Sequence, residues 1–107
     1  MPELPRGTVT FLFTDIEGST PLWERDHQAM GGAVERHLAL LANAIRAQGG
    51  IPFKTVGDAM QAAFPTAPAA IAAAIAAQRA LLAEDWGEIG ALRVRMAVHA
   101  GEAEPDE

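Results

Sequence analysis

Three segments of the chain carry the pattern of β-strands. Residues 8–14 (TVTFLFT) are β-branched or aromatic and place bulk on both faces, which predicts a central strand. Residues 51–64 (IPFKTVGDAMQAAF) read as two short extended segments joined in a tight hairpin by a Gly-Asp pair. Residues 92–100 (LRVRMAVHA) alternate apolar side chains with Arg93 and Arg95, so we expect a half-exposed strand whose arginines form a solvated face.

Between the first strand and the hairpin the pattern is helical. Pro21 suits the first turn of a short helix, and Gly31 and Gly32 predict a break or bend after it. Residues 33–45 then place apolar side chains at helical spacing, until the sequence QGG ends this second helix.

A third helix follows the hairpin. Thr66 is suited to cap it and Pro68 to stand in its first turn. Ile71, Ile75 and Leu82 fall together on one of its faces. The stretch is mostly alanine and too short and weakly apolar for a membrane span, so we interpret it as a helix of the folded domain.

The predicted order of elements is β-α-α-β-β-α-β. A first strand beside a hairpin, with helices packed on one face, indicates an α+β, ferredoxin-like sandwich with an antiparallel sheet. We expect a single domain over residues 1–107, with residues 1–6 and 102–107 as flexible tails.

Composition and charge narrow the possible partners. A net charge of −6 without a basic patch argues against nucleic acid or direct contact with an anionic membrane. It is compatible with a nucleotide, because a divalent cation brings its own positive charge. The absence of cysteine excludes disulfides and thiolate chemistry. The first residues, MPELPRG, lack the apolar segment of a secretion signal, so we expect a cytoplasmic protein.

Two acidic residues lie at loop positions where they could together bind a metal ion. Asp15 ends the first predicted strand, and Asp58 lies at the hairpin tip. In this topology the two positions can lie side by side, and paired carboxylates suit Mg²⁺ or Mn²⁺. Gly18, Ser19 and Thr20 then lead into a helix, where backbone N–H groups can hold phosphate oxygens.

Lys54 lies four residues before Asp58, so the two side chains are expected to share a face and one cleft. Each feature also has a purely structural interpretation. The acidic residues could belong to ordinary turns, and Lys54 could be a solvated strand lysine. His27, His37 and His99 show no spacing of metal ligands, and we interpret them as surface or hydrogen-bonded core residues.

The stretches FTDIEGST and KTVGDAMQAAF, followed by RVRMAVHAGEAE, together resemble the catalytic domain of class III nucleotidyl cyclases. The resemblance runs over nearly the whole chain. It implies that Asp15 and Asp58 are the two metal-binding aspartates, and that the backbone carbonyl of Ile16 also contacts a metal. It implies two Mg²⁺ or Mn²⁺ ions per site.

The same resemblance implies how the substrate is held. Gly18, Ser19, Thr20 and Gly57 match residues around the triphosphate. Lys54 matches the base-reading position, where adenylyl cyclases have lysine and guanylyl cyclases have glutamate. The expected substrate is therefore ATP, and the expected products are 3′,5′-cyclic AMP and pyrophosphate.

The sequence departs from the family pattern in one respect. The family stabilises its transition state with an asparagine and an arginine that follow the last strand and act across a head-to-tail dimer. The one asparagine of this chain, Asn43, lies in a predicted helix and does not match. We therefore expect an incomplete cyclase domain that needs a homodimer or another cyclase domain as partner and is inactive alone.

Three other interpretations remain open at this stage. The chain could be a regulatory module that binds metal and nucleotide without turnover. It could be similar to diguanylate cyclases, although Lys54 and the absence of their Gly-Gly-acid-acid-Phe turn count against this. It could also be an interaction domain in which both acidic positions are only turns.

Overall fold

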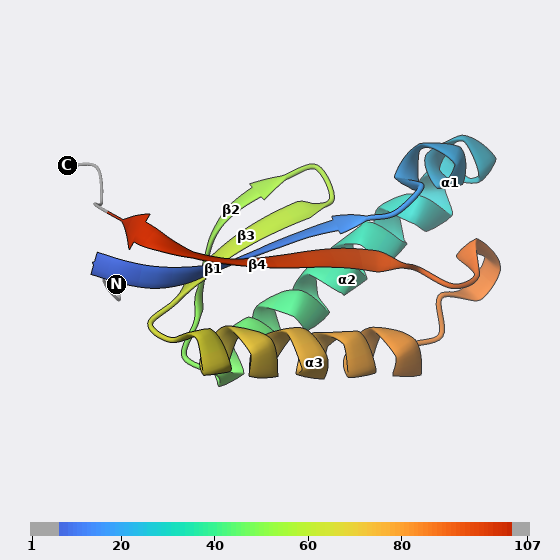
Figure 1. Cartoon of the computed structure of the whole chain (residues 1–107). Coiled ribbons are helices and arrows are strands. Elements are labelled where there is room, and N and C mark those ends of the chain that lie inside the picture. The colour runs from blue at the N-terminus through green and yellow to red at the C-terminus, as the bar shows by residue number, and fades with distance from the viewer. Residues whose placement is uncertain (1–6, 104–107) are drawn as a thin grey trace.

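A computed structural model describes residues 7–103 of the chain. Three helices and a four-stranded sheet make up this region (Figure 1). In chain order the elements are β1 (Gly7–Ile16), α1 (Ser19–Arg25), α2 (His27–Ala47), β2 (Ile51–Val56), β3 (Ala59–Phe64), α3 (Ala67–Ala83), the short 3₁₀ turn η1 (Gly87–Ile89) and β4 (Val94–Ala103).

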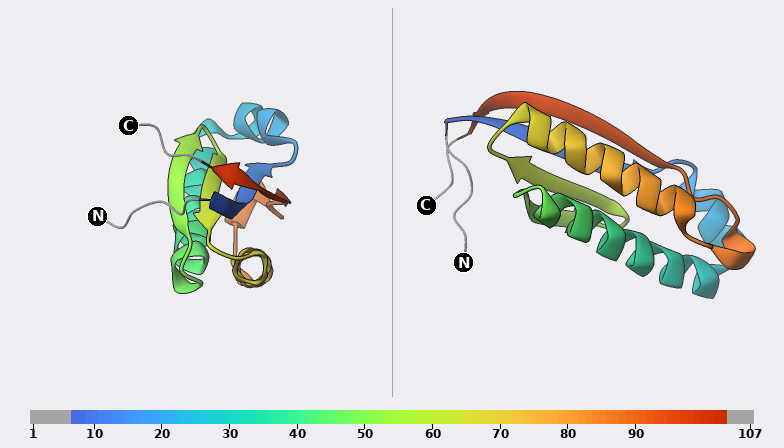
Figure 2. Two further views of the ribbon diagram at one scale, coloured as in Figure 1. Left: turned by 60° about the vertical axis from the view of Figure 1, so that its left-hand side comes forward. Right: turned by 90° about the horizontal axis from the view of Figure 1, so that it is seen from below.

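The sheet has the strand order β2-β3-β1-β4, and every neighbouring pair is antiparallel. Helices α2 and α3 lie side by side against one face, and the opposite face carries no helix among the described elements (Figure 2). The α+β, ferredoxin-like sandwich with helices on one face is confirmed, as are the element order and the central position of β1.

Alternation along β1 explains which side is buried. Leu12 and Ile16 point toward the helices and are almost fully buried, whereas Phe11 and Phe13 point to the uncovered face. Phe64 on β3 fills the space between the sheet and the helices and is fully buried. Burial of these apolar side chains between sheet and helices is the main force that holds the layers together.

Helix α3 packs through its small side chains. The buried positions are alanines and Leu81, which let the helix approach the sheet closely. Ile71, Ile75 and Leu82 do share a face, but it is the solvent face, where they are 51%, 48% and 85% exposed. No helix within residues 7–103 combines the length and hydropathy needed to cross a membrane.

The break between the first two helices was predicted at the wrong place. It falls at Asp26, whose backbone is extended (φ −157°) and whose carboxylate accepts a hydrogen bond from the N–H of Ala29 at 3.0 Å. This side chain caps α2, so the helix starts at His27 and continues through Gly31 and Gly32. Packing of the helix on the core outweighs the weak helix propensity of the two glycines.

The last strand is displaced from its predicted position. It begins at Val94 and continues to Ala103, because it pairs with β1 from Ile16↔Val94 to Gly7↔Ala103. The expected C-terminal tail was therefore wrong for positions 102 and 103. The expected tails at 1–6 and 104–107 lie outside the described residues.

Candidate metal and nucleotide site

Asp15 lies near the end of β1 on the uncovered face of the sheet. Its carboxylate accepts two hydrogen bonds from Arg95 on β4, from Nε to Oδ1 at 2.8 Å and from Nη2 to Oδ2 at 2.7 Å. The two residues stand directly opposite each other in the β1–β4 pairing. The hydrogen bonds from Arg95 hold the pKa of Asp15 below its ordinary value, against a smaller opposing effect of burial.

Arg95 is therefore more than the solvated strand residue that the sequence predicted. It remains largely exposed, but its guanidinium forms a two-pronged ion pair with Asp15. The hydrogen bonds and charge of Asp15 raise the pKa of Arg95, with further contributions from the charges of Glu17 and Asp58. Arg95 thus bonds Asp15 directly, and the charges of Glu17 and Asp58 act on it more weakly.

Asp58 is the second residue of the two-residue loop that joins β2 and β3. Gly57 supplies the left-handed backbone (φ 59°) that this tight turn needs, and the hairpin at Gly57–Asp58 is confirmed. The tip lies at the same end of the sheet as Asp15, because β1 and β3 pair as far as Thr14↔Met60. The predicted proximity of the two loops follows from this register.

A cleft of about 330 Å³ opens between β3, β1 and β4 on the uncovered face. Asp15 and Arg95 form its polar part and Phe13 its apolar part. The lining residues are Phe13, Thr14, Asp15, Ala59, Met60, Gln61, Arg95, Met96 and Ala97. Asp58 does not line this cleft, although its neighbour in the chain, Ala59, does.

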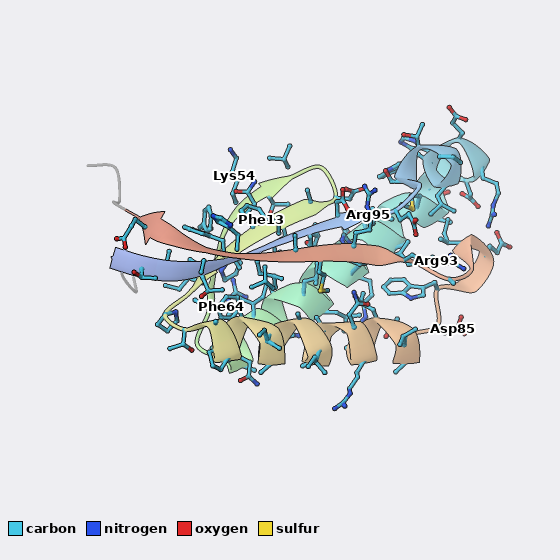
Figure 3. All side chains as sticks on the ribbon, viewed as in Figure 1. Phe13, Lys54, Phe64, Asp85, Arg93 and Arg95 are labelled. Carbon is cyan, nitrogen blue, oxygen red and sulfur yellow. The ribbon has the colours of Figure 1, made fainter. Side chains whose placement is uncertain are left out.

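Lys54 does not line this cleft either. It is exposed on β2 and stands opposite Gln61, which in turn stands opposite Phe13. Lys54 therefore lies on the uncovered face, two strands away from β1, and Figure 3 shows its side chain well apart from Arg95. Neither Lys54 nor Asp58 lines the cleft that Asp15 and Arg95 share.

The predicted phosphate loop is shorter than expected. Gly18 adopts a left-handed backbone (φ 65°) and stands at the N-cap of α1, without a side-chain hydrogen bond to the helix. Ser19 and Thr20 are already the first residues of α1. The N–H groups of this first turn thus have no capping side chain and point out of the helix end that follows β1.

The donor set fits a divalent cation bound partly by substrate. Within residues 7–103 there is no cluster of three or more histidine and carboxylate side chains that could hold a metal alone. Asp15 and Asp58 can supply two carboxylates, and Mg²⁺ in nucleotide sites typically uses one or two, completing its shell with water and phosphate oxygens.

Two other side chains of the site were missed by sequence reasoning. The buried hydroxyl of Thr14 bonds both the N–H and the carbonyl of Met60, each at 3.3 Å. His37 is fully buried, and its Nε2 lies 3.1 Å from the carbonyl oxygen of Asp58. The interpretation of His37 as a hydrogen-bonded core residue is confirmed, but only the tertiary structure shows which loop it contacts.

The described chain is thus a ferredoxin-like α+β domain with two acidic loops and an arginine at one end of its uncovered sheet face. A family model described as the adenylate and guanylate cyclase catalytic domain matches residues 1–103. The chain belongs to this family.

Named relatives agree with that assignment. An adenylate cyclase of Schizosaccharomyces pombe is 43% identical over 77% of this chain. An adenylate cyclase of Podospora anserina is 37% identical over 95% of it. The chain spans only 5% and 6% of the length of these two relatives.

Solved structures give the same fold. An adenylate cyclase from Trypanosoma brucei, described in its monomeric state, superposes with a TM-score of 0.85 at 29% identity, covering 96% of this chain and 60% of that one. An adenylyl cyclase from P. aeruginosa gives a TM-score of 0.77 at 27% identity, covering 94% of this chain and 59% of the other. A dimeric guanylyl cyclase domain from Blastocladiella emersonii, at 16% identity and a TM-score of 0.78, shares the fold. This chain therefore covers only part of a cyclase catalytic domain.

Proposed function

We propose that this chain supplies the metal-binding half of an adenylyl cyclase site, which converts ATP to 3′,5′-cyclic AMP and pyrophosphate. The observation that carries the proposal is that the Asp15–Arg95 ion pair and the hairpin tip that bears Asp58 lie at the same end of the sheet. Family membership and the adenylate cyclase relatives support the same reaction.

Two Mg²⁺ or Mn²⁺ ions would be held by Asp15, Asp58 and the backbone carbonyl of Ile16. Such ions lower the pKa of the ribose 3′-hydroxyl and neutralise charge on the triphosphate. The chain's own contribution is to present ionised carboxylates, and Arg95 already keeps the pKa of Asp15 low.

Arg95 takes a second role in this proposal. A cation bound by Asp15 would take the place of the guanidinium, and Arg95 would then be available beside the cleft that both residues line. Guanidinium groups pair well with phosphate oxygens. Gly57 and the first turn at Gly18, Ser19 and Thr20 would border the same triphosphate through their backbone N–H groups.

Lys54 would read the base. A lysine ammonium can donate to the acceptor N1 of adenine, whereas guanine presents an N1–H donor at that place. Lys54 stands apart from Asp15 on the sheet, so we place its base contact in a site completed by a second cyclase domain that carries the transition-state residues. We place this assembly in the cytoplasm, without nucleic-acid or membrane contacts.

The test is a cyclic AMP assay in trans. This chain is mixed with ATP, Mn²⁺ and a cyclase domain that keeps the transition-state asparagine and arginine but has both metal aspartates replaced. We expect no product from either chain alone and product from the mixture. The chain with Asp15→Asn and Asp58→Asn serves as the matched control and should give none.

Product from the control mixture would overturn the assigned role of the two aspartates. Absence of product from the wild-type mixture, with association of the two chains demonstrated, would overturn the catalytic proposal. Metal-dependent ATP binding in that second case would support the regulatory module instead.

A further inference from the structure

His37 is the one fully buried histidine of the described chain, and the proposed chemistry does not use it. Its ring lies between helix α2 and the hairpin tip. Nδ1 faces the carbonyl oxygen of Val34, one turn earlier in α2, and Nε2 faces the carbonyl oxygen of Asp58 at 3.1 Å. One side chain thus connects the rigid helix to the loop that carries the second aspartate.

The two carbonyl oxygens differ in their need for a donor. Val34 lies inside α2, where its carbonyl accepts a main-chain hydrogen bond from the next turn. Asp58 lies in the hairpin loop outside the β2–β3 ladder, and His37 is the donor that the described part of the chain offers its carbonyl. A neutral imidazole has a single N–H. We place its proton on Nε2, where it satisfies the carbonyl that otherwise lacks a partner, and Nδ1 then packs against the Val34 carbonyl without a hydrogen bond.

A second buried polar side chain contacts the chain just after the β2–β3 hairpin loop. Thr14 on β1 bonds both main-chain groups of Met60, two residues after Asp58. Thr14 directly precedes Asp15 in the chain. Beyond the main-chain ladders, two buried polar side chains thus hold the region between the two aspartates, and His37 is the one that contacts the tip.

We propose that His37 is a positioning residue for the metal site: by donating from Nε2 to the main-chain carbonyl of Asp58, it fixes the hairpin tip so that the Asp58 carboxylate faces Asp15. This inference rests on the proposed function for its metal, but the fixed tip is a property of the chain itself. Side chains that orient metal ligands affect metal affinity by about tenfold or more when they are removed.

Glutamine and asparagine separate the two contacts of His37. The amide nitrogen of glutamine reaches the position of Nε2, and that of asparagine only the position of Nδ1. His37→Gln therefore keeps a donor to Asp58, and His37→Asn keeps only the contact to Val34. Leu41→Ala, at a fully buried position one turn later in α2, serves as the control for general destabilisation.

Three quantities are measured on the 107-residue chain and its variants. They are the dissociation constant for Mn²⁺ from the EPR signal of the free ion, amide hydrogen exchange at residues 57–59, and the melting temperature. We expect His37→Asn to weaken Mn²⁺ binding about tenfold and to speed exchange at the tip. His37→Gln should remain within about threefold of the wild type in both, and Leu41→Ala should lower the melting temperature without a selective change at the tip.

Equal Mn²⁺ affinities and equal tip exchange in His37→Asn and His37→Gln would overturn the positioning role. Failure of the proposed function has a different signature, because Asp58→Ala would then bind Mn²⁺ as tightly as the wild type. In that event, amide hydrogen exchange at the hairpin tip tests the positioning role of His37 without reference to metal binding. Selective opening of residues 57–59 in His37→Asn supports the positioning role, and unchanged exchange overturns it.

Discussion

At the scale of single residues, the ion pair between Asp15 and Arg95 stabilises the folded chain. In the proposed site, the same pair would compete with a metal ion for the Asp15 carboxylate. The guanidinium lowers the pKa of Asp15, chiefly through its hydrogen bonds. Because this pKa lies below the ordinary value of about 3.9, the pair stabilises the folded chain above that pH. The contribution is lost as the pH falls through the lowered pKa.

Replacing Arg95 by alanine should therefore raise the pKa of Asp15 toward its ordinary value. The measurement is a pH titration of the Asp15 carboxyl carbon by NMR. Arg93→Ala is the matched control, since it removes the same charge from an exposed position two residues earlier without a bond to Asp15. An unchanged Asp15 titration in Arg95→Ala would show that the ion pair is absent in solution.

The same variant should bind Mn²⁺ more tightly than the wild type, because the metal no longer displaces a guanidinium from Asp15. EPR titration of Mn²⁺ measures the change. In the mixed cyclic AMP assay, Arg95→Ala should nevertheless lose activity, because no guanidinium remains for the phosphates. Weaker Mn²⁺ binding would contradict the competition between Arg95 and the metal.

At the scale of elements, two glycines near opposite ends of α2 test how the helix and hairpin pack. A Cβ added to Gly50 would lie 2.3 Å from Cε1 of Phe64, whose ring is fully buried and cannot move aside. A Cβ added to Gly32, inside α2, would meet nothing within 4 Å. The absence of a side chain at Gly50 thus lets the Phe64 ring pack against the backbone. Gly32 makes no such contact and only lowers the stability of α2.

We expect Gly50→Ala to lower the free energy of unfolding by about 1–3 kcal/mol through overpacking. Gly32→Ala should raise it by about 1 kcal/mol, because alanine is the better helix former. Urea denaturation followed by circular dichroism measures both changes. A destabilising Gly32→Ala would mean that α2 is bent or broken at the glycines after all.

At the scale of the whole molecule, the uncovered sheet face carries a cluster of partly exposed phenylalanines that could contact another protein domain. Phe11, Phe13 and Phe53 cluster there with ring centroids 6.2 Å apart for Phe11–Phe13 and for Phe11–Phe53. Phe13 and Phe53 are 37% and 40% exposed. Exposed apolar clusters of this kind mark interaction surfaces, and the proposed cyclase partner is the expected occupant.

Phe53→Glu should therefore reduce activity in the mixed assay at least about tenfold by placing a charge in the interface. Its melting temperature should stay close to that of the wild type. Ile75→Glu, at a comparably exposed position on α3 on the other side of the molecule, is the control and should leave activity intact. Equal effects of the two substitutions would remove the uncovered face as the contact surface.

Much of the fold was predictable because its signals are local. Alternation marked the strands, the Gly-Asp pair marked the hairpin, and Thr66 marked the start of α3, where its hydroxyl accepts from the N–H of Ala69. The helix break was misplaced at Gly31 and Gly32, because a capping aspartate at position 26 decides it and packing carries the helix through both glycines.

The sequence by itself determined the elements, their order and the acidic residues at two loops, since these depend on side chains within a few positions of each other. Only the tertiary structure decided that Arg95 meets Asp15, 80 positions away, and that His37 supports Asp58. Such contacts depend on the register of the antiparallel strands and on which face of α2 is buried. A shift of one residue in the register would turn Arg95 to the other side of the sheet, and local preferences alone do not choose between the two.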